Sequence, residues 1–412
     1  MRVILAVLLA AAAATAAAQP ASEGAAAPLA DLVERAWSIW RQTSIQQARS
    51  AELDARALAN RAFFAGAPSV GADLRRDQPR WAGLPGTDTA PERGRNEIDV
   101  GISAPVWLPG QRDAQRRVLE RERGSLSAAT ALERLRVAGQ VREAVWAASL
   151  ARAELRVQQA RHDTAAALEA DVTRRVAAGD LAPSDRLLAQ GEVLGAGAAV
   201  RDAQARQALA TAALAQLTGV DHAGDVSEPP APSTEPDTHP ALIAAREAVA
   251  ASRARLDYAR ATRRDSPTVG VAARFDRDTY TSGYRNTIRV GLSVPLDTEA
   301  RNAPRLAAAS AELTEAEIAL QRELRARQAE AQRAQLALEA AHAALDLNTK
   351  RATVAREALA AIERAFRAGE RSLPEVLRVR AQTLDAELAR DAAREQLGLA
   401  IARLNQAQGI QP

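Results

Sequence analysis

Two stretches far apart in the chain are near copies of one another, and they set the strongest limit on its fold. They read EIDVGISAP at 97–105 and TIRVGLSVP at 287–295. In both, apolar residues alternate with small or polar ones, which is the period of a β-strand with two different faces. The apolar face is formed by Val100, Ile102, Val290 and Leu292. The polar face is formed by Asp99, Ser103, Arg289 and Ser293.

Each copy follows a shorter stretch of the same character, so the sequence predicts two hairpins. Their strands are expected at about 68–76 and 96–105, and at about 267–275 and 286–295. Nearly everything else has helical periodicity, including the region from 28 to about 67. The longest helices are expected over 111–178 and 303–368. At about 1.5 Å per residue each would be roughly 100 Å long, which is more than a globular domain can use.

The two hairpins belong to two copies of one larger unit. A constant offset of 190 maps Gly101 onto Gly291, Gly179 onto Gly369 and Gly219 onto Gly409. The sequence therefore predicts a first repeat over 19–219, a Pro-rich linker over 220–239 and a second repeat over 240–412. Only the first hairpin departs from the offset. Because insertions collect in exposed loops, we expect the hairpin tips to be loops in solvent.

The start of the chain and its charge indicate where it acts. Residues 1–18 carry Arg2 followed by an Ala-rich apolar run, the pattern of a cleaved secretory signal peptide. With 0 Cys, neither a lipid anchor on cysteine nor a disulfide is expected. Lys and Arg number 54 against 51 Asp and Glu, interspersed without a basic cluster, which argues against nucleic-acid binding.

Four two-faced strands in an exported helical chain pose a physical problem. An isolated hairpin is marginally stable in water, and two hairpins cannot close a barrel alone. In lipid every backbone polar group must be satisfied internally, so open sheet edges are not tolerated there. If the apolar faces meet lipid, several chains must contribute strands to one barrel. Three chains would supply twelve strands of the length that spans an outer membrane.

The sequence resembles the TolC-type family of outer-membrane efflux channels over the whole mature chain. The resemblance rests on the duplicated order of helix, hairpin, long helix, turn and helix. It also rests on the motifs VGISAPVWLPGQR, VGLSVPLD, AAGDLAPSDRLLAQ and RAGERSLPEVLRVRAQ. The HPAL segment at 239–242 looks most like the heavy-metal, cobalt-zinc-cadmium type, branch of the family.

The resemblance implies a mainly α fold with a membrane β-barrel. Three chains would form a twelve-stranded barrel in the outer membrane, continued by an α-helical tunnel across the periplasm. The implied partners are two further copies of the chain, outer-membrane lipid, a periplasmic adaptor (membrane fusion protein) and an inner-membrane pump of the RND type. The implied function is a passive export duct, and divalent heavy-metal cations are its implied cargo. Drugs or other small molecules are the alternative cargo.

The turns at Gly179 and Gly369 have the Gly-then-Pro chemistry of helix reversals. The resemblance adds that they form the periplasmic tip, where the tunnel closes. The family's constricting acidic residues correspond to Glu375, which keeps the charge, and to Arg378, which does not. The family's links between the two tip turns correspond to Arg371 and Asp185. A doubled acidic constriction is therefore not expected here.

No motif for catalysis or cofactor binding is present: the sequence lacks a nucleophile elbow, an HExxH pair and a Gly-rich phosphate loop. The four His residues, His162, His222, His239 and His342, lack the spacing of metal ligands. We therefore expect neither an enzyme nor a bound metal or cofactor. The alternative to a channel is a soluble periplasmic coiled-coil structural or adaptor protein.

Overall fold

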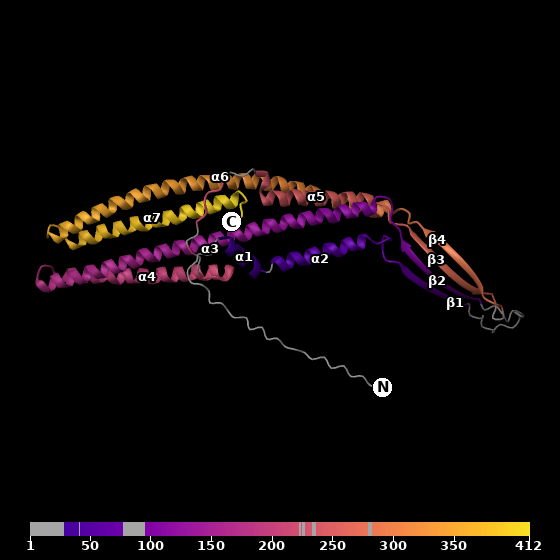
Figure 1. Cartoon of the computed structure of the whole chain (residues 1–412), viewed down its shortest axis with the longest axis horizontal. Helices are drawn as coiled ribbons and strands as arrows, with labels where there is room; N and C mark the ends of the chain where they lie inside the picture. Colours follow the sequence, from indigo (N-terminus) through magenta and orange to yellow (C-terminus); the bar gives the residue numbers. More distant parts are fainter. Residues whose placement is uncertain are drawn as a thin grey trace, which may run out of the picture.

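In the computed structural model, long helices lead from one end of the molecule to a small β-sheet at the other (Figure 1). The structure describes residues 29–412 except 41, 77–94, 222–223, 225–226, 233–235 and 279–281. The expected signal peptide and the expected loop of the first hairpin lie outside these residues. In chain order the elements are α1 (Leu29–Ile39), α2 (Gln42–Asn60), β1 (Ser69–Arg76), β2 (Asn96–Pro105), α3 (Gln111–Ala178), α4 (Pro183–Thr218), η1 (Pro236–Thr238), α5 (Pro240–Ala261), β3 (Thr268–Arg277), β4 (Arg285–Ser293), α6 (Thr298–Arg367) and α7 (Leu373–Ala407).

The region from 28 to about 67 is helical as expected only as far as Asn60. The segment forms two helices, α1 and α2, and the second ends at Asn60. Trp37 of α1 is buried together with Val141 of α3 and Leu214 of α4, so packing fixes α1 separately from α2. The end of α2 is tied to the start of α3, because Arg112 donates from Nε to the Asn60 carbonyl at 3.0 Å.

The helix α6 begins at Thr298, before the expected start at 303, and its first turn contacts the segment between α5 and β3. The Thr298 hydroxyl accepts a hydrogen bond from the Asp265 amide at 3.3 Å, and Glu299 pairs with Arg264 at 2.7 Å. The carboxylate also lies at an N-terminus, where a negative charge is favourable. Hydrogen bonding by the Arg264 side chain lowers the pKa of Glu299.

The long helices are each flanked by shorter ones. In Figure 1, α4 and α7 lie along the sheet-distal parts of α3 and α6, while α2 and α5 continue toward the sheet. Buried alanines recur every seven residues on the flanking helices: Ala189, Ala196 and Ala203 on α4, and Ala386, Ala393, Ala400 and Ala407 on α7. A seven-residue seam is the repeat of a left-handed coiled coil, and small side chains let helix axes approach closely.

The four strands form one antiparallel sheet in the order β1-β2-β3-β4. The two hairpins have matching registers, because Gly71 lies opposite Gly101 and Gly270 lies opposite Gly291. The halves of the chain meet where β2 pairs with β3, with Gly101 opposite Ala272. This leaves β1 and β4 as the edges. Of the helices in the described residues, none is both long enough and apolar enough to cross a bilayer.

Candidate functional site

The first candidate surface is the apolar face of the sheet. Residues directly opposite each other in a sheet share a face, and Ile102, Val271 and Val290 are aligned in this way across three strands. Val100 and Leu292 lie on the same face. Val290 exposes 77% of its surface and Leu292 exposes 66%, so these side chains have no cover within the chain. Contiguous exposed apolar surface of this kind marks a contact with lipid or another protein.

The opposite face of the sheet carries the polar residues. The carboxylate of Asp99 accepts hydrogen bonds from Nε and Nη2 of Arg274, at 3.1 and 2.9 Å. Arg289 lies 3.6 Å from the same carboxylate. Ser103 is bonded through its hydroxyl to that of Ser69 at 3.0 Å, across the β1–β2 hairpin. The structure thus brings Asp99 and Arg289 together, on the face opposite Val290.

Close backbone approach explains two of the glycines on the polar face. A Cβ on Gly101 would lie 2.8 Å from the Cβ of Ala272, and one on Gly270 would lie 3.2 Å from the Cβ of Ser103. A larger residue at either position would therefore require the facing strand to shift. A shallow hollow lies here, with Asp99 and Arg289 among its lining residues.

The second candidate surface is the pair of turns at the far end of the long helices. Gly179 and Gly369 have φ of 87° and 80°, the left-handed conformation that glycine adopts without strain. In each turn the glycine N–H and the next N–H bond to carbonyls of the preceding helix, as in Asp180 to Arg175 and Glu370 to Ala365, both 2.9 Å. The two turns are therefore structural copies of one another.

The charged residues of the tip are engaged within their own turns. Asp185 accepts from the Ala182 amide at 3.2 Å, which caps α4. Glu375 accepts from the Ser372 amide at 3.2 Å, and this hydrogen bond is the main cause of its lowered pKa. Arg371 pairs with Glu375 at 3.1 Å.

Among the described residues of one chain, Arg371 and Asp185 form no hydrogen bond or ion pair with each other. The predicted link between them therefore stays a prediction, and it concerns assembled copies. Arg378 is exposed on α7, one turn beyond Glu375.

An apolar cluster holds the two tip hairpins together. Its buried members come from both pairs of long helices: Val172, Ala189, Phe366, Leu373 and Val376. The guanidinium of Arg175 lies 5.0 Å from the centre of the Phe366 ring, a cation–π contact from α3 to α6.

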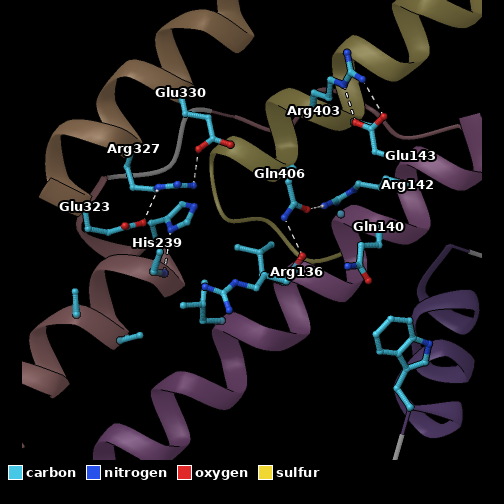
Figure 2. Close-up of a pocket in the computed structure, with 18 of the residues that line it drawn as sticks. Arg136, Gln140, Arg142, Glu143, His239, Glu323, Arg327, Glu330, Arg403 and Gln406 are labelled. Carbon is cyan, nitrogen blue, oxygen red and sulfur yellow. Dashed lines mark hydrogen bonds and ion pairs between the residues drawn. The ribbon is translucent and has the colours of Figure 1, made fainter. Parts of the chain in front are cut away.

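The third candidate surface is a cavity at mid-length, between α3, α5, α6 and α7 (Figure 2). His239 caps α5 at its wall, where Nδ1 accepts from the Ala241 amide at 3.0 Å. The neutral ring must then carry its proton on Nε2, which is buried without a hydrogen-bond partner. Arg327 lies beside it, paired with Glu323 and Glu330 at 2.9 and 2.6 Å.

Burial lowers the pKa of His239, and the nearby Arg327 lowers it further, against the smaller opposing effects of Glu330 and Glu323. A lowered pKa means that the folded protein holds the ring neutral, whereas the unfolded chain binds a proton below about pH 6.5. The ring therefore costs no stability above that pH and destabilises the fold increasingly as the pH falls below it.

We expect His239→Asn to reduce the acid sensitivity of the fold. Asparagine can still accept at the N-cap, so the variant removes the titrating ring while keeping a capping oxygen. Between pH 7 and pH 5, the melting temperature of the variant should fall less than that of the wild type. His342→Asn, which alters a different histidine of the chain, is the control. Parallel pH profiles of wild type and His239→Asn would contradict the expectation.

Within the described ranges, no group of three or more His, Cys, Asp or Glu side chains is arranged to hold a metal ion. The sequence pattern also missed several residues that the fold brings together. Arg274 was not singled out, although it lies directly opposite Asp99. The HPAL segment was noticed only as a motif. Its His-Pro order predicts a helix that begins at Pro240 with His239 as the cap, because proline favours the first helical position after a cap.

Comparison with known proteins supports the reading of the fold. The sequence profile of the outer membrane efflux protein family matches residues 232–410, the second half and the end of the linker. Among curated proteins, no sequence matches the chain.

Three solved structures illustrate the shared fold. The outer membrane protein VceC of Vibrio cholerae superposes with a TM-score of 0.72 at 17% identity, covering 92% of this chain and 96% of VceC. CusC, whose structures are described with transmembrane channel formation, superposes with a TM-score of 0.71 at 16% identity, covering 95% of this chain and 96% of CusC. The open MtrE outer membrane channel of Neisseria gonorrhoeae superposes with a TM-score of 0.68 at 17% identity, covering 93% of this chain and 89% of MtrE. The chain therefore has the fold of TolC-like outer-membrane channels along nearly its whole length.

Proposed function

We propose that the protein is the outer-membrane channel of a tripartite export system. In this proposal three copies form a twelve-stranded barrel, and their helices form a tunnel across the periplasm. The channel receives cargo from an inner-membrane pump of the RND type through a periplasmic adaptor. It is a passive duct rather than an enzyme, and it holds no cofactor.

One observation carries this proposal: the sheet has a continuous exposed apolar face and, opposite it, a polar face. Val290 and Leu292 are among the most exposed apolar side chains of the described residues, whereas many other apolar side chains are buried in the core. A strand with one apolar and one polar face suits a wall between lipid and water. The proposal assigns Val100, Ile102, Val290 and Leu292 to lipid, and Asp99, Ser103, Arg289 and Ser293 to the lumen.

The alternative is a soluble periplasmic coiled-coil or adaptor protein whose sheet is covered by another protein. The two proposals differ in where the protein is found. Fractionation of cells that produce the full chain should place it in the outer membrane, and mild detergent should extract trimers that resist SDS until heated. Recovery as a periplasmic monomer would refute the channel.

For the cargo we propose divalent heavy-metal cations, supported by the resemblance of the HPAL segment to the heavy-metal branch of the family. Deletion of the gene should sensitise cells to cobalt, zinc or cadmium salts and leave their sensitivity to dyes and drugs unchanged. The opposite pattern would assign drugs or other small molecules as the cargo. Reintroduced wild-type protein should restore resistance, which ties the effect to this chain.

We propose that the tip turns close the tunnel, with Gly179 and Gly369 at the reversals. Asp185 and Arg371 of neighbouring copies would link the closed turns, and Glu375 would form an acidic ring. For Arg371 the link requires a change of partner, because in one chain it pairs with Glu375. An exposed ion pair is worth about 0–1 kcal/mol, but three copies act together on one closed state.

We expect Arg371→Ser and Asp185→Ala each to raise single-channel conductance in planar bilayers, because each removes a link that favours the closed tip. Combining the two changes should add little if the residues bond to each other. Glu375→Gln should lower cation preference by removing the acidic ring.

Lys350→Ser is the matched control for the tip variants, because it also breaks an exposed ion pair within one helix, with Asp346, but lies away from the tip turns. Unchanged conductance in both single variants would show that closure depends on the apolar cluster of the tip instead.

A further inference from the structure

We propose the register in which copies of the chain join: where β4 of one copy meets β1 of the next, as the proposed barrel requires, Gly291 lies opposite Asp73 and Leu292 lies opposite Ala72. The inference rests on the proposed trimeric channel and specifies its seam. Within the described sheet, β1 and β4 are the two edges, and every residue of both strands is exposed. Edge strands in lipid must pair with another chain.

The template for this seam lies inside the chain. The strands β2 and β3 belong to different halves, yet they pair directly, with Gly101 opposite Ala272 and Ile102 opposite Val271. This junction between the halves is related by the duplication to the junction that two copies must form. The pairing of β2 with β3 is therefore the model for the pairing of β4 with β1 between copies.

The duplication transfers this register to the outer edges. An offset of 190 carries β2 onto β4, so Gly101 corresponds to Gly291. An offset of 199 carries β1 onto β3, so Ala272 corresponds to Asp73. Both hairpins have the same internal register in these offsets, so their geometry is equivalent. A seam that repeats β2–β3 must then place Gly291 opposite Asp73.

Closure of the barrel supports the same register. A line drawn across the strands passes from Gly71 through Gly101, Ala272 and Arg289, and in the proposed seam it reaches Arg75 of the next copy. The line therefore advances four residues per copy, or twelve around three copies. With about 3.4 Å per residue and about 4.8 Å between strands, this gives a strand tilt of about 35°. A shift of two residues in one direction gives about 20°, well below the usual range of about 35–45°, and a shift in the other direction gives about 47°, at the upper end of that range.

One side-chain pair argues for a different register. The proposed seam places Arg289 opposite Arg75, at the position that Asp99 and Arg274 occupy between the halves. A shift of two residues would instead place Arg289 opposite Asp73. A cross-strand charge pair contributes only about 0.2–1 kcal/mol, and these side chains lie on the polar face. The tilt of the whole barrel and the equivalence of the halves outweigh this term.

Disulfide formation tests the register, and the chain contains 0 Cys, so every thiol is introduced deliberately. One double variant carries Gly291→Cys with Asp73→Cys, and a second carries Leu292→Cys with Ala72→Cys. Adjacent pairs alternate between hydrogen-bonded and non-hydrogen-bonded positions, so one of the two has the closer spacing that favours a disulfide. The matched internal control is Gly101→Cys with Ala272→Cys, which should close within one chain.

Two further double variants test the shifted registers: Gly291→Cys with Gly71→Cys, and Ser293→Cys with Asp73→Cys. After oxidation of outer membranes, the proposed pairs should give covalent trimers that only a reductant dissolves, at least tenfold more than the shifted pairs. The internal control should stay monomeric. Trimers from a shifted pair alone would overturn the register and leave the channel intact. No covalent oligomer from any pair would overturn the seam, and recovery of all variants as periplasmic monomers would overturn the channel as well.

Discussion

Val290→Arg is expected to abolish most trimer assembly in the outer membrane. The side chain lies on the apolar face, exposes 77% of its surface and follows the same alignment as Ile102 and Val271. In the proposed barrel this face meets lipid, where an arginine near the bilayer midplane costs about 2–4 kcal/mol. The cost falls on each of three copies, so a moderate penalty per strand becomes a large one for the assembly. The yield of SDS-resistant trimer from outer membranes measures it.

The control for this variant is Ser293→Arg, on the same strand but on the opposite face. The lumen contains water, so a new guanidinium there is solvated and assembly should stay close to wild type. Leu292→Arg, on the apolar face, should behave like Val290→Arg. If Val290→Arg and Ser293→Arg assemble equally well, the assignment of the two faces is wrong.

Arg142→Ala is expected to lower the free energy of unfolding by about 3–5 kcal/mol, because it leaves a largely buried carboxylate without its partner. Arg142 is 2% exposed and donates to both carboxylate oxygens of Glu228, at 3.0 and 2.7 Å. It also donates to Gln406 at 2.7 Å and to the Ile410 carbonyl at 3.1 Å. One guanidinium thus joins α3, the linker and the C-terminal segment.

Arg403→Ala supplies the matched control, because Arg403 also pairs with a glutamate, Glu143, at mid-length (Figure 2). Those side chains are 57% and 51% exposed, so the loss should be only about 0–1 kcal/mol. Urea unfolding followed by tryptophan fluorescence measures both variants. Similar losses in the two would show that Arg142 does not organise the middle of the chain. Faster proteolysis near Glu228 should accompany Arg142→Ala and be absent from Arg403→Ala.

The strands and tip turns could be predicted from sequence because their signals are local. Alternation with period two identifies a two-faced strand such as β4, and the 190-residue offset identifies its relative β2. Glycine followed by proline identifies the turns at Gly179 and Gly369, where the structure shows positive φ. The long helix α3 has no proline and few glycines, so its length could also be predicted.

Long-range contacts could not be predicted in this way. Arg142 meets Glu228 and Gln406 across 86 and 264 residues, and no spacing rule relates positions so far apart. The pairing of Asp99 with Arg274 depends on the register of β2 against β3, which one strand's pattern does not contain. The separation of α1 from α2 depends on burial of Trp37 against other helices. The proposed link between Arg371 and Asp185 joins neighbouring copies, so a single chain does not form it.

The most direct test of the channel is a planar-bilayer recording of the purified trimer. We expect discrete, long-lived conductance steps in wild type, larger steps in Arg371→Ser, and no activity in Val290→Arg prepared in the same way. Because a passive duct needs no pump to carry ions, the adaptor and the pump are left out of the recording. Absence of steps from both wild type and Arg371→Ser, with trimers verified in the same sample, would contradict the account.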